Sequence, residues 1–287
     1  MNPKGNDGGS RRRRSRWLWI PIIAMLLALA AVPVAVLRVL PDAPPLDQVW
    51  MATPGTYGRI ERLDHDVAAL FFERPTSYML GALQLGDAVP SMSWADEAAF
   101  ERDLAAGVIP AHVRAVMYDP EYWVATPVDQ QQDPVAAMQA FSEAARAAGY
   151  QVVITPHPNL ALVPGGDCVA QPGEAMERAF LRCGIQGQAA AVADVVEVQA
   201  QFLEEQPDYY AQIVRVATSQ ARDANPDVVV LSGLSTRFAA TPQILLDAWT
   251  AVHEDVDGHY LAMPEGIRPW IATRFLGLVA QTDETRD

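Results

Sequence analysis

The feature that most constrains the fold is an alternation of two apolar periods along residues 49–280. Short apolar runs bounded by turn residues are followed by longer stretches with helical spacing, with a repeat of roughly 30 to 40 residues, as in strand–helix–strand units. The runs predicted to be strands are 49–53, 77–83, 113–118, 151–155, 194–201, 228–232 and 259–263.

Helix-start signals lie between these runs. Asp133-Pro134 and Thr241-Pro242 each place a capping side chain before a proline, which is favoured at the first helical position. The predicted helices are 94–106 after Ser93, 134–148, 207–225 and 243–252.

A strand–helix–strand alternation implies parallel strands joined by crossover helices. Seven units suit a closed α/β barrel of the (β/α)8 or TIM type in which one element is poorly marked. An open doubly wound sheet is the alternative, but no GxGxxG follows the first strand. We therefore predict one barrel domain over residues 49–280, followed by a tail at 281–287.

The amino-terminal region predicts a membrane anchor. Five arginines between positions 11 and 16 precede an apolar run, residues 17–37, which as a helix measures about 30 Å, the thickness of a bilayer core. Positive charge is retained on the cytoplasmic side. We expect a cytoplasmic tail at 1–16, a single transmembrane helix at 17–40 in contact with lipid, a proline-rich spacer at 41–48 and an extracytoplasmic barrel.

A cleaved secretory signal is the alternative for this region. Ala28-Leu29-Ala30 has the small-x-small pattern of a cleavage site, but the apolar run continues beyond it and is longer than a typical signal core of about 7 to 15 residues. Both interpretations place the remainder of the chain outside the cytoplasm.

The charge balance limits the partners of this remainder. After Arg38 the chain has 14 Lys and Arg residues against 34 Asp and Glu residues, a formal charge of about −20. Such a surface repels phosphate backbones, so we expect no nucleic-acid partner. Neutral or cationic ligands are favoured.

Both cysteines, Cys168 and Cys183, lie in the part predicted to be exported. An even count in an oxidising compartment favours a disulfide, and a ring of about 15 residues would stabilise the fold by about 3 kcal/mol in the chain-entropy model. Two unrelated buried thiols are the alternative.

The strongest candidate site follows the predicted strand 113–118. Working residues of such barrels project from the carboxyl ends of the strands. Here two carboxylates stand among three aromatic residues, and strand alternation puts both carboxylates on one side. Paired carboxylates divide acid and base roles, and aromatic rings stack on sugars. The residues are Asp119 and Glu121 with Tyr118, Tyr122 and Trp123; a turn cap with rim packing is the alternative.

The predicted strand 194–201 adds a polar row. Glu197, Gln199 and Gln201 share one face and apolar residues share the other. The outer face of a barrel strand packs on helices, so the polar row should point into the lumen. Its partners would be Thr155 or His157 at a neighbouring strand end, Ser232, or a bound ligand; a self-satisfied polar layer is the other possibility.

Two further residues stand at predicted strand ends. Glu265 follows strand 259–263 and His157 follows strand 151–155 between two prolines. His157 is a candidate acid, base or ligand, but it has no second histidine at metal spacing. His253 to Asp257 lacks the second histidine of HExxH, and Gly233 to Arg237 lacks the last glycine of GxSxG. We expect no cofactor and no metal.

With these strand ends, the domain resembles the (β/α)8-barrel glycoside hydrolases at the level of architecture. The residues that carry the resemblance are Tyr118 to Trp123, Glu197 and Glu265. The chain departs from the largest such group, whose acid/base glutamate follows an asparagine at the end of the fourth strand, and it keeps only the final DxE of the chitinase-like DxxDxDxE signature. The resemblance implies a carbohydrate ligand.

We therefore predict a membrane-anchored barrel that hydrolyses carbohydrate of the envelope or the extracellular space. The candidate catalytic carboxylates are Asp119, Glu121, Glu197 and Glu265. One alternative is a non-catalytic surface barrel that binds a glycan or an envelope partner through the same aromatic residues. Another is a metal-dependent hydrolase that uses His157 with Asp119 or Glu121.

Overall fold

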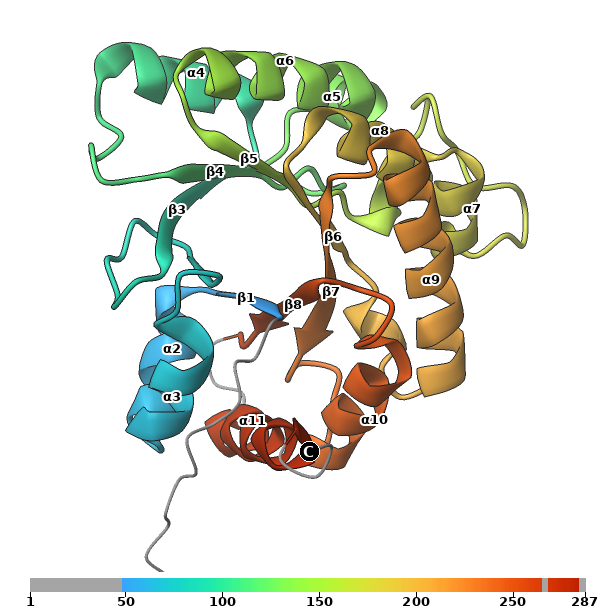
Figure 1. Cartoon of the computed structure of the whole chain (residues 1–287). Coiled ribbons are helices and arrows are strands. Elements are labelled where there is room, and N and C mark those ends of the chain that lie inside the picture. Colours follow the sequence, from blue (N-terminus) through green and yellow to red (C-terminus); the bar gives the residue numbers. More distant parts are fainter. Residues whose placement is uncertain (1–47, 265–267, 284–287) are drawn as a thin grey trace, which may run out of the picture. The chain divides into compact units, whose positions relative to one another are not determined.

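The computed structural model describes residues 48–264 and 268–283. Eight parallel strands form a closed barrel in chain order, and the last strand pairs with the first (Figure 1). The (β/α)8 prediction is therefore confirmed. The strands are β1 (Val49–Ala52), β2 (Tyr78–Met79), β3 (Val89–Trp94), β4 (Ala115–Tyr118), β5 (Gln151–Ile154), β6 (Val195–Val198), β7 (Val229–Ser235) and β8 (Gly258–Ala262).

Each predicted strand overlaps an observed one, and β3 is the element that the sequence pattern did not mark. Its sequence, Val-Pro-Ser-Met-Ser-Trp, contains a proline and two serines, which are typical of loops rather than of a buried parallel strand. Trp94 was predicted to begin a helix and instead ends β3. That helix begins three residues later, with Asp96 rather than Ser93 as its cap.

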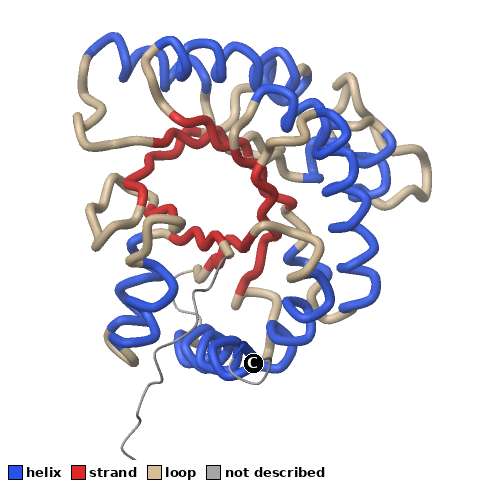
Figure 2. Tube along the Cα trace, in the orientation of Figure 1, coloured by secondary structure: helices blue, strands red, loops and turns tan. Residues whose placement is uncertain are grey.

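The helices form an outer layer around the ring of strands (Figure 2). The proline-start predictions are confirmed, because the side chains of Asp133 and Thr241 accept hydrogen bonds from the amides of Ala136 and Ile244. The helices are α2 (Pro54–Glu61), α3 (His65–Phe72), α4 (Glu97–Ala106), α5 (Val128–Gln132), α6 (Pro134–Ala147), α7 (Met176–Arg182), α8 (Ile185–Val192), α9 (Pro207–Ala224), α10 (Pro242–Val252) and α11 (Pro269–Asp283), with 3-10 turns η1 (Pro158–Leu162) and η2 (Gln201–Leu203).

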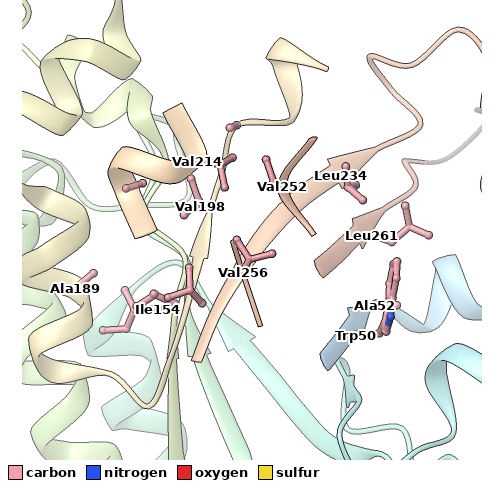
Figure 3. Close-up of a cluster of buried hydrophobic side chains, with 14 of the residues drawn as sticks. Trp50, Ala52, Ile154, Ala189, Val198, Val214, Leu234, Val252, Val256 and Leu261 are labelled. Carbon is pink, nitrogen blue, oxygen red and sulfur yellow. The ribbon is translucent and has the colours of Figure 1, made fainter. Parts of the chain in front are cut away.

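Strand alternation divides the buried apolar residues into two clusters. Residues that point outward pack between the strands and the helices, among them Trp50, Ile154 and Val198 (Figure 3). Residues that point inward form a second cluster inside the barrel, which is called the lumen floor here. Its buried members are Met51, Tyr78, Leu80, Ala115, Met117, Val153, Val195 and Leu231.

The disulfide prediction is confirmed. Cys168 and Cys183 are bonded, with their Cα atoms 5.9 Å apart. The bond joins the loop between η1 and α7 to the residue that follows α7. It closes the ring of about 15 residues for which the chain-entropy model gives about 3 kcal/mol.

The predicted anchor and one candidate residue lie outside the described residues. These are the tail 1–16, the apolar segment 17–40, nearly all of the spacer 41–48, and Glu265. Within 48–264 and 268–283, none of the helices combines the length and the apolar character needed to cross a bilayer. The anchor therefore stays a prediction.

Candidate active site

Three neighbouring strands bring polar side chains together at the carboxyl end of the barrel. Asp119 follows β4, Thr155 follows β5 and Gln199 follows β6. The Asp119 Oδ1 atom accepts a hydrogen bond from Thr155 Oγ1 at 2.8 Å and another from Gln199 Nε2 at 2.9 Å. The predicted partnership between the Gln199 row and Thr155 is therefore present, with Asp119 at its centre.

The amide side chains of this cluster have a defined direction. Gln199 Nε2 also donates to the backbone carbonyl of Thr155 at 2.7 Å. Gln201 Nε2 donates to Gln199 Oε1 at 3.4 Å. Gln201 lies in η2 rather than in β6, but the bond keeps it beside the two residues with which the strand prediction grouped it.

Burial raises the pKa of Asp119 to about 6, and its hydrogen bonds with Thr155 and Gln199 oppose that rise. Burial also raises the pKa of Glu121 to about 7, and the charge of Asp119 contributes to it. The Glu121 amide donates to Thr126 Oγ1 at 3.2 Å, which fixes the turn after β4. Two carboxyl groups two residues apart thus have different affinities for a proton near neutral pH.

Glu197 lies deeper, inside β6, with 1% of its surface exposed. Neither of its side-chain oxygens has a hydrogen-bond partner among the described residues. The pKa of Glu197 is raised well above its usual range, first by burial and then by the charges of Asp119 and Glu121. Burial therefore favours the protonated form of Glu197 unless a ligand supplies a compensating charge.

His157 is held beside the same cluster by two backbone bonds. Its amide donates to the carbonyl of Pro120 at 3.1 Å, and its Nδ1 atom accepts from the amide of Asn159 at 3.0 Å. Burial lowers the pKa of His157 to about 4. A neutral ring that accepts at Nδ1 carries its proton on Nε2, so His157 offers a hydrogen-bond donor rather than a positive charge.

Two of the three predicted platform residues are accessible. Tyr122 is 44% exposed and Trp123 is 46% exposed, and Trp123 Nε1 donates to Thr126 Oγ1 at 3.0 Å. Tyr118 points away from the lumen. It is fully buried, stacks on Phe141 with ring centroids 5.2 Å apart, and donates to Gln130 Oε1.

The structure therefore contradicts the prediction that Tyr118 binds substrate. The residue belongs to β4, where alternation turns its side chain toward the helices when Met117 and Asp119 face the lumen. Ser232, considered as a partner of the polar row, also has another role, because its Oγ atom lies 2.8 Å from His259 Nδ1 in a buried pair.

The sequence prediction missed Gly233 and Tyr260, which are paired in register on β7 and β8. A Cβ atom added at Gly233 would lie 2.5 Å from Glu197 Oε1 and 2.6 Å from Gln201 Oε1. Tyr260 packs against the lumen floor, and burial together with the charge of Glu197 raises its pKa. The available signal was a glycine directly after the predicted strand 228–232, because a glycine in a strand often marks a close approach by another group.

The described residues contain no set of three or more His, Cys, Asp or Glu side chains arranged to hold a metal ion. The absence of a metal or cofactor from the site stays a prediction.

The known proteins that resemble this chain do so only distantly. No family profile matches the chain, and no curated sequence matches it. Among solved structures, a β-1,3-glucanosyltransferase from Rhizomucor miehei shares 10% identity, with 76% of this chain and 88% of that chain covered and a TM-score of 0.43. A GH18 chitinase from the fern Peteris ryukyuensis shares 14% identity, with 73% of this chain and 72% of that chain covered and a TM-score of 0.40. A sugar phosphate isomerase/epimerase from Parabacteroides distasonis shares 12% identity, with 83% of this chain and 98% of that chain covered and a TM-score of 0.45.

These neighbours include glycoside hydrolase-like barrels as well as an isomerase, so the likeness extends to architecture and no further. The function has to be argued from the side chains of this chain.

Proposed function

We propose that this protein is a glycoside hydrolase-like enzyme whose site lies at the carboxyl end of the barrel. The observation that supports the proposal is the pair Asp119 and Glu121, whose environments separate their proton affinities. Glycosidases require one ionised and one protonated carboxyl group at the same time.

Asp119 is the group suited to the ionised role. Two hydrogen-bond donors, Thr155 and Gln199, point at its Oδ1 atom and stabilise a negative charge there. It acts as the nucleophile or as the base that activates water. Glu121, with the higher pKa and a half-buried position next to the rim, acts as the general acid that protonates the leaving oxygen.

The surroundings of the pair suit a sugar. Tyr122 and Trp123 follow Glu121 directly and expose ring surface, while the bonds to Thr126 and Asn159 hold this turn in place. Aromatic rings of this kind provide flat apolar surface with a polar edge. His157 adds a neutral donor from the next strand end.

We further propose that the enzyme acts outside the cytoplasm on envelope or extracellular carbohydrate, held at the membrane by residues 17–40. The support is the apolar run with its preceding arginines. Glu265 stays a candidate carboxylate.

The test is hydrolysis of a panel of aryl glycosides and oligosaccharides by the full chain and by Asp119→Asn. Asn keeps the shape of the side chain but cannot act as nucleophile or base, so turnover should fall by about a hundredfold to ten-thousandfold. The dependence of kcat/KM on pH should be bell-shaped and should peak between about 6 and about 7, because Asp119 must be ionised and Glu121 protonated.

Glu121→Gln should remove the alkaline limb of this profile. Glu143→Gln, on α6, is a control whose side chain is exposed and remote from the site. Glycan binding without turnover by the unmodified chain would support the non-catalytic alternative. Turnover that Asp119→Asn leaves intact would refute the proposed mechanism.

A further inference from the structure

Three buried side-chain oxygens have no hydrogen-bond partner among the described residues, and two of them approach the same point of the barrel wall. They are both carboxyl oxygens of Glu197 and the Oε1 atom of Gln201, all buried and unpartnered within the described part of the chain. The position of a Cβ at Gly233 would be 2.5 Å from Glu197 Oε1 and 2.6 Å from Gln201 Oε1, so these two oxygens are at most 5.1 Å apart, the sum of both distances. A side chain at position 233 would therefore require Glu197 and Gln201 to shift.

The orientation of the Gln201 amide is set by its neighbour. Its Nε2 atom donates to Gln199 Oε1, and Gln199 cannot reverse because its own Nε2 atom donates to Asp119 and to the Thr155 carbonyl. Reversal of Gln201 alone would bring two acceptor oxygens together. The hydrogen bonds therefore hold Gln201 Oε1 as a free acceptor.

The missing donor does not come from a basic side chain. Within the described ranges no Lys or Arg forms an ion pair with Asp119, Glu121 or Glu197, and His157 is neutral. Buried acceptors without donors destabilise the folded chain. Protonated Glu197 supplies one donor of its own, whereas a primary ammonium supplies three donors and a positive charge that favours the Glu197 carboxylate.

We propose that the pocket formed by Glu197, Gln201 and Gly233 binds the ammonium group of an amino sugar. This inference rests on the proposed function, since it names the substrate class of the same site. Glu197 and Gln201 bind the ammonium group, and Gly233 is a positioning residue that leaves space for both side chains. The excess of acidic residues after Arg38 favours the approach of a cationic glycan.

Binding should release a proton. In the free protein burial favours the protonated form of Glu197, whereas a bound ammonium group favours the carboxylate. Each amino sugar that enters as a cation should therefore displace one proton from Glu197. An N-acetylated sugar or a neutral sugar carries no charge to displace it.

The experiment is calorimetric titration of the full chain at pH 7 in two buffers of different ionisation enthalpy. The probes are the gluco and galacto monosaccharides and the β-1,4-linked gluco trisaccharides, each with an amine, an N-acetyl group or a hydroxyl at carbon 2. The amine form should bind about tenfold to a hundredfold more tightly than its N-acetyl and hydroxyl counterparts, the range expected for a charged hydrogen bond. It should also release close to one proton.

Glu197→Gln should abolish both the amine preference and the proton release, and Gly233→Ala should weaken the preference by displacing Glu197 and Gln201. Glu204→Gln is the matched control, because Glu204 is also a buried glutamate with a raised pKa, but one of its carboxyl oxygens accepts a hydrogen bond from the Ser235 amide. The Glu204→Gln variant should keep the preference for the amine form of the sugar. The sugar series on the unmodified chain tests the inference even where a variant does not fold.

Equal binding of the three forms, no binding by any amino sugar, or a preference that survives Glu197→Gln would overturn the inference. Amine-selective binding without turnover would support the amino-sugar inference and refute the proposed hydrolase function. Turnover of neutral glycans without amine preference would keep the hydrolase and refute the inference.

Discussion

The two halves of the barrel interior come from the same strands but differ in how their side chains are satisfied. Two residues before Asp119 lies Met117, and two residues before Glu197 lies Val195. The earlier residue of each pair belongs to the apolar lumen floor, which is closely packed and needs no partner beyond its neighbours. The later residue is a carboxyl group in a polar layer that is only partly hydrogen-bonded.

The difference shows which half maintains the fold and which half is available for chemistry. The lumen floor excludes water and lowers the local dielectric, and this raises the pKa of the carboxyl groups above it. Unpaired acidic groups destabilise a folded chain, so their retention beside a packed floor is typical of a functional site.

Removing bulk from the floor should have the largest effect on stability. Leu231 is fully buried, so Leu231→Ala should lower the free energy of unfolding by about 2–5 kcal/mol through lost burial and a residual cavity. Denaturant unfolding measures the loss, and Asp119→Asn provides the comparison from the polar layer. A loss below about 1 kcal/mol would show that the floor is not closely packed.

Removing the carboxyl group of Glu197 should raise the free energy of unfolding at neutral pH, which is the opposite of the effect expected for Leu231→Ala. Unfolded Glu197 ionises near its usual pKa of about 4.3, whereas burial raises the pKa of the folded group well above this, so its contribution to stability is complete at lower pH and declines as pH rises. The decline is at most about 1.4 kcal/mol per pH unit above that value. Glu197→Gln should flatten the stability profile between pH 5 and pH 8.

Thermal unfolding across this pH range measures the effect of Glu197→Gln. A slope identical to that of the unmodified chain would mean that Glu197 is already ionised in the fold, which would contradict its assignment as a buried proton carrier.

The smallest effects are expected for two aromatic residues at the edge of the polar layer, Trp123 and Tyr118. Trp123→Ala removes exposed ring surface and should weaken glycan binding by about 0.5–1.5 kcal/mol. Tyr118→Phe removes a buried hydroxyl that donates to Gln130, so it should cost about 1 kcal/mol of stability and leave binding unchanged. Calorimetric titration and denaturant unfolding separate the two. Weaker binding in Tyr118→Phe would return this residue to the site.

Local patterns in the sequence predict most of the barrel, because hydrophobic period and helix caps are properties of neighbouring residues. The hydrophobic period predicted seven of the strands, and the cap-then-proline pattern predicted the helices that begin at Pro134 and Pro242. The strand β3 did not, because its identity depends on pairing with β2 and β4 on either side and not on its own composition.

The site was predictable in part for the same reason. Alternation correctly placed Glu197 on the lumen side of β6. Tyr118, at the end of β4, was also predicted to belong to the site, but it faces the helices. The sequence contains the spacing of Asp119 and Glu121; it does not contain the register between strands that carries Thr155 and Gln199 to Asp119.

By itself, then, the sequence determined the class of barrel, the disulfide partners, the excess of negative charge and the strand ends that carry carboxyl groups. Tertiary structure decided which polar groups meet, that Gly233 makes room for Glu197 and Gln201, and that three of their oxygens have no hydrogen-bond partner among the described residues. The physical reason is that hydrophobic period acts over a few residues, whereas desolvation and hydrogen bonding in the lumen depend on strands that are far apart in the chain.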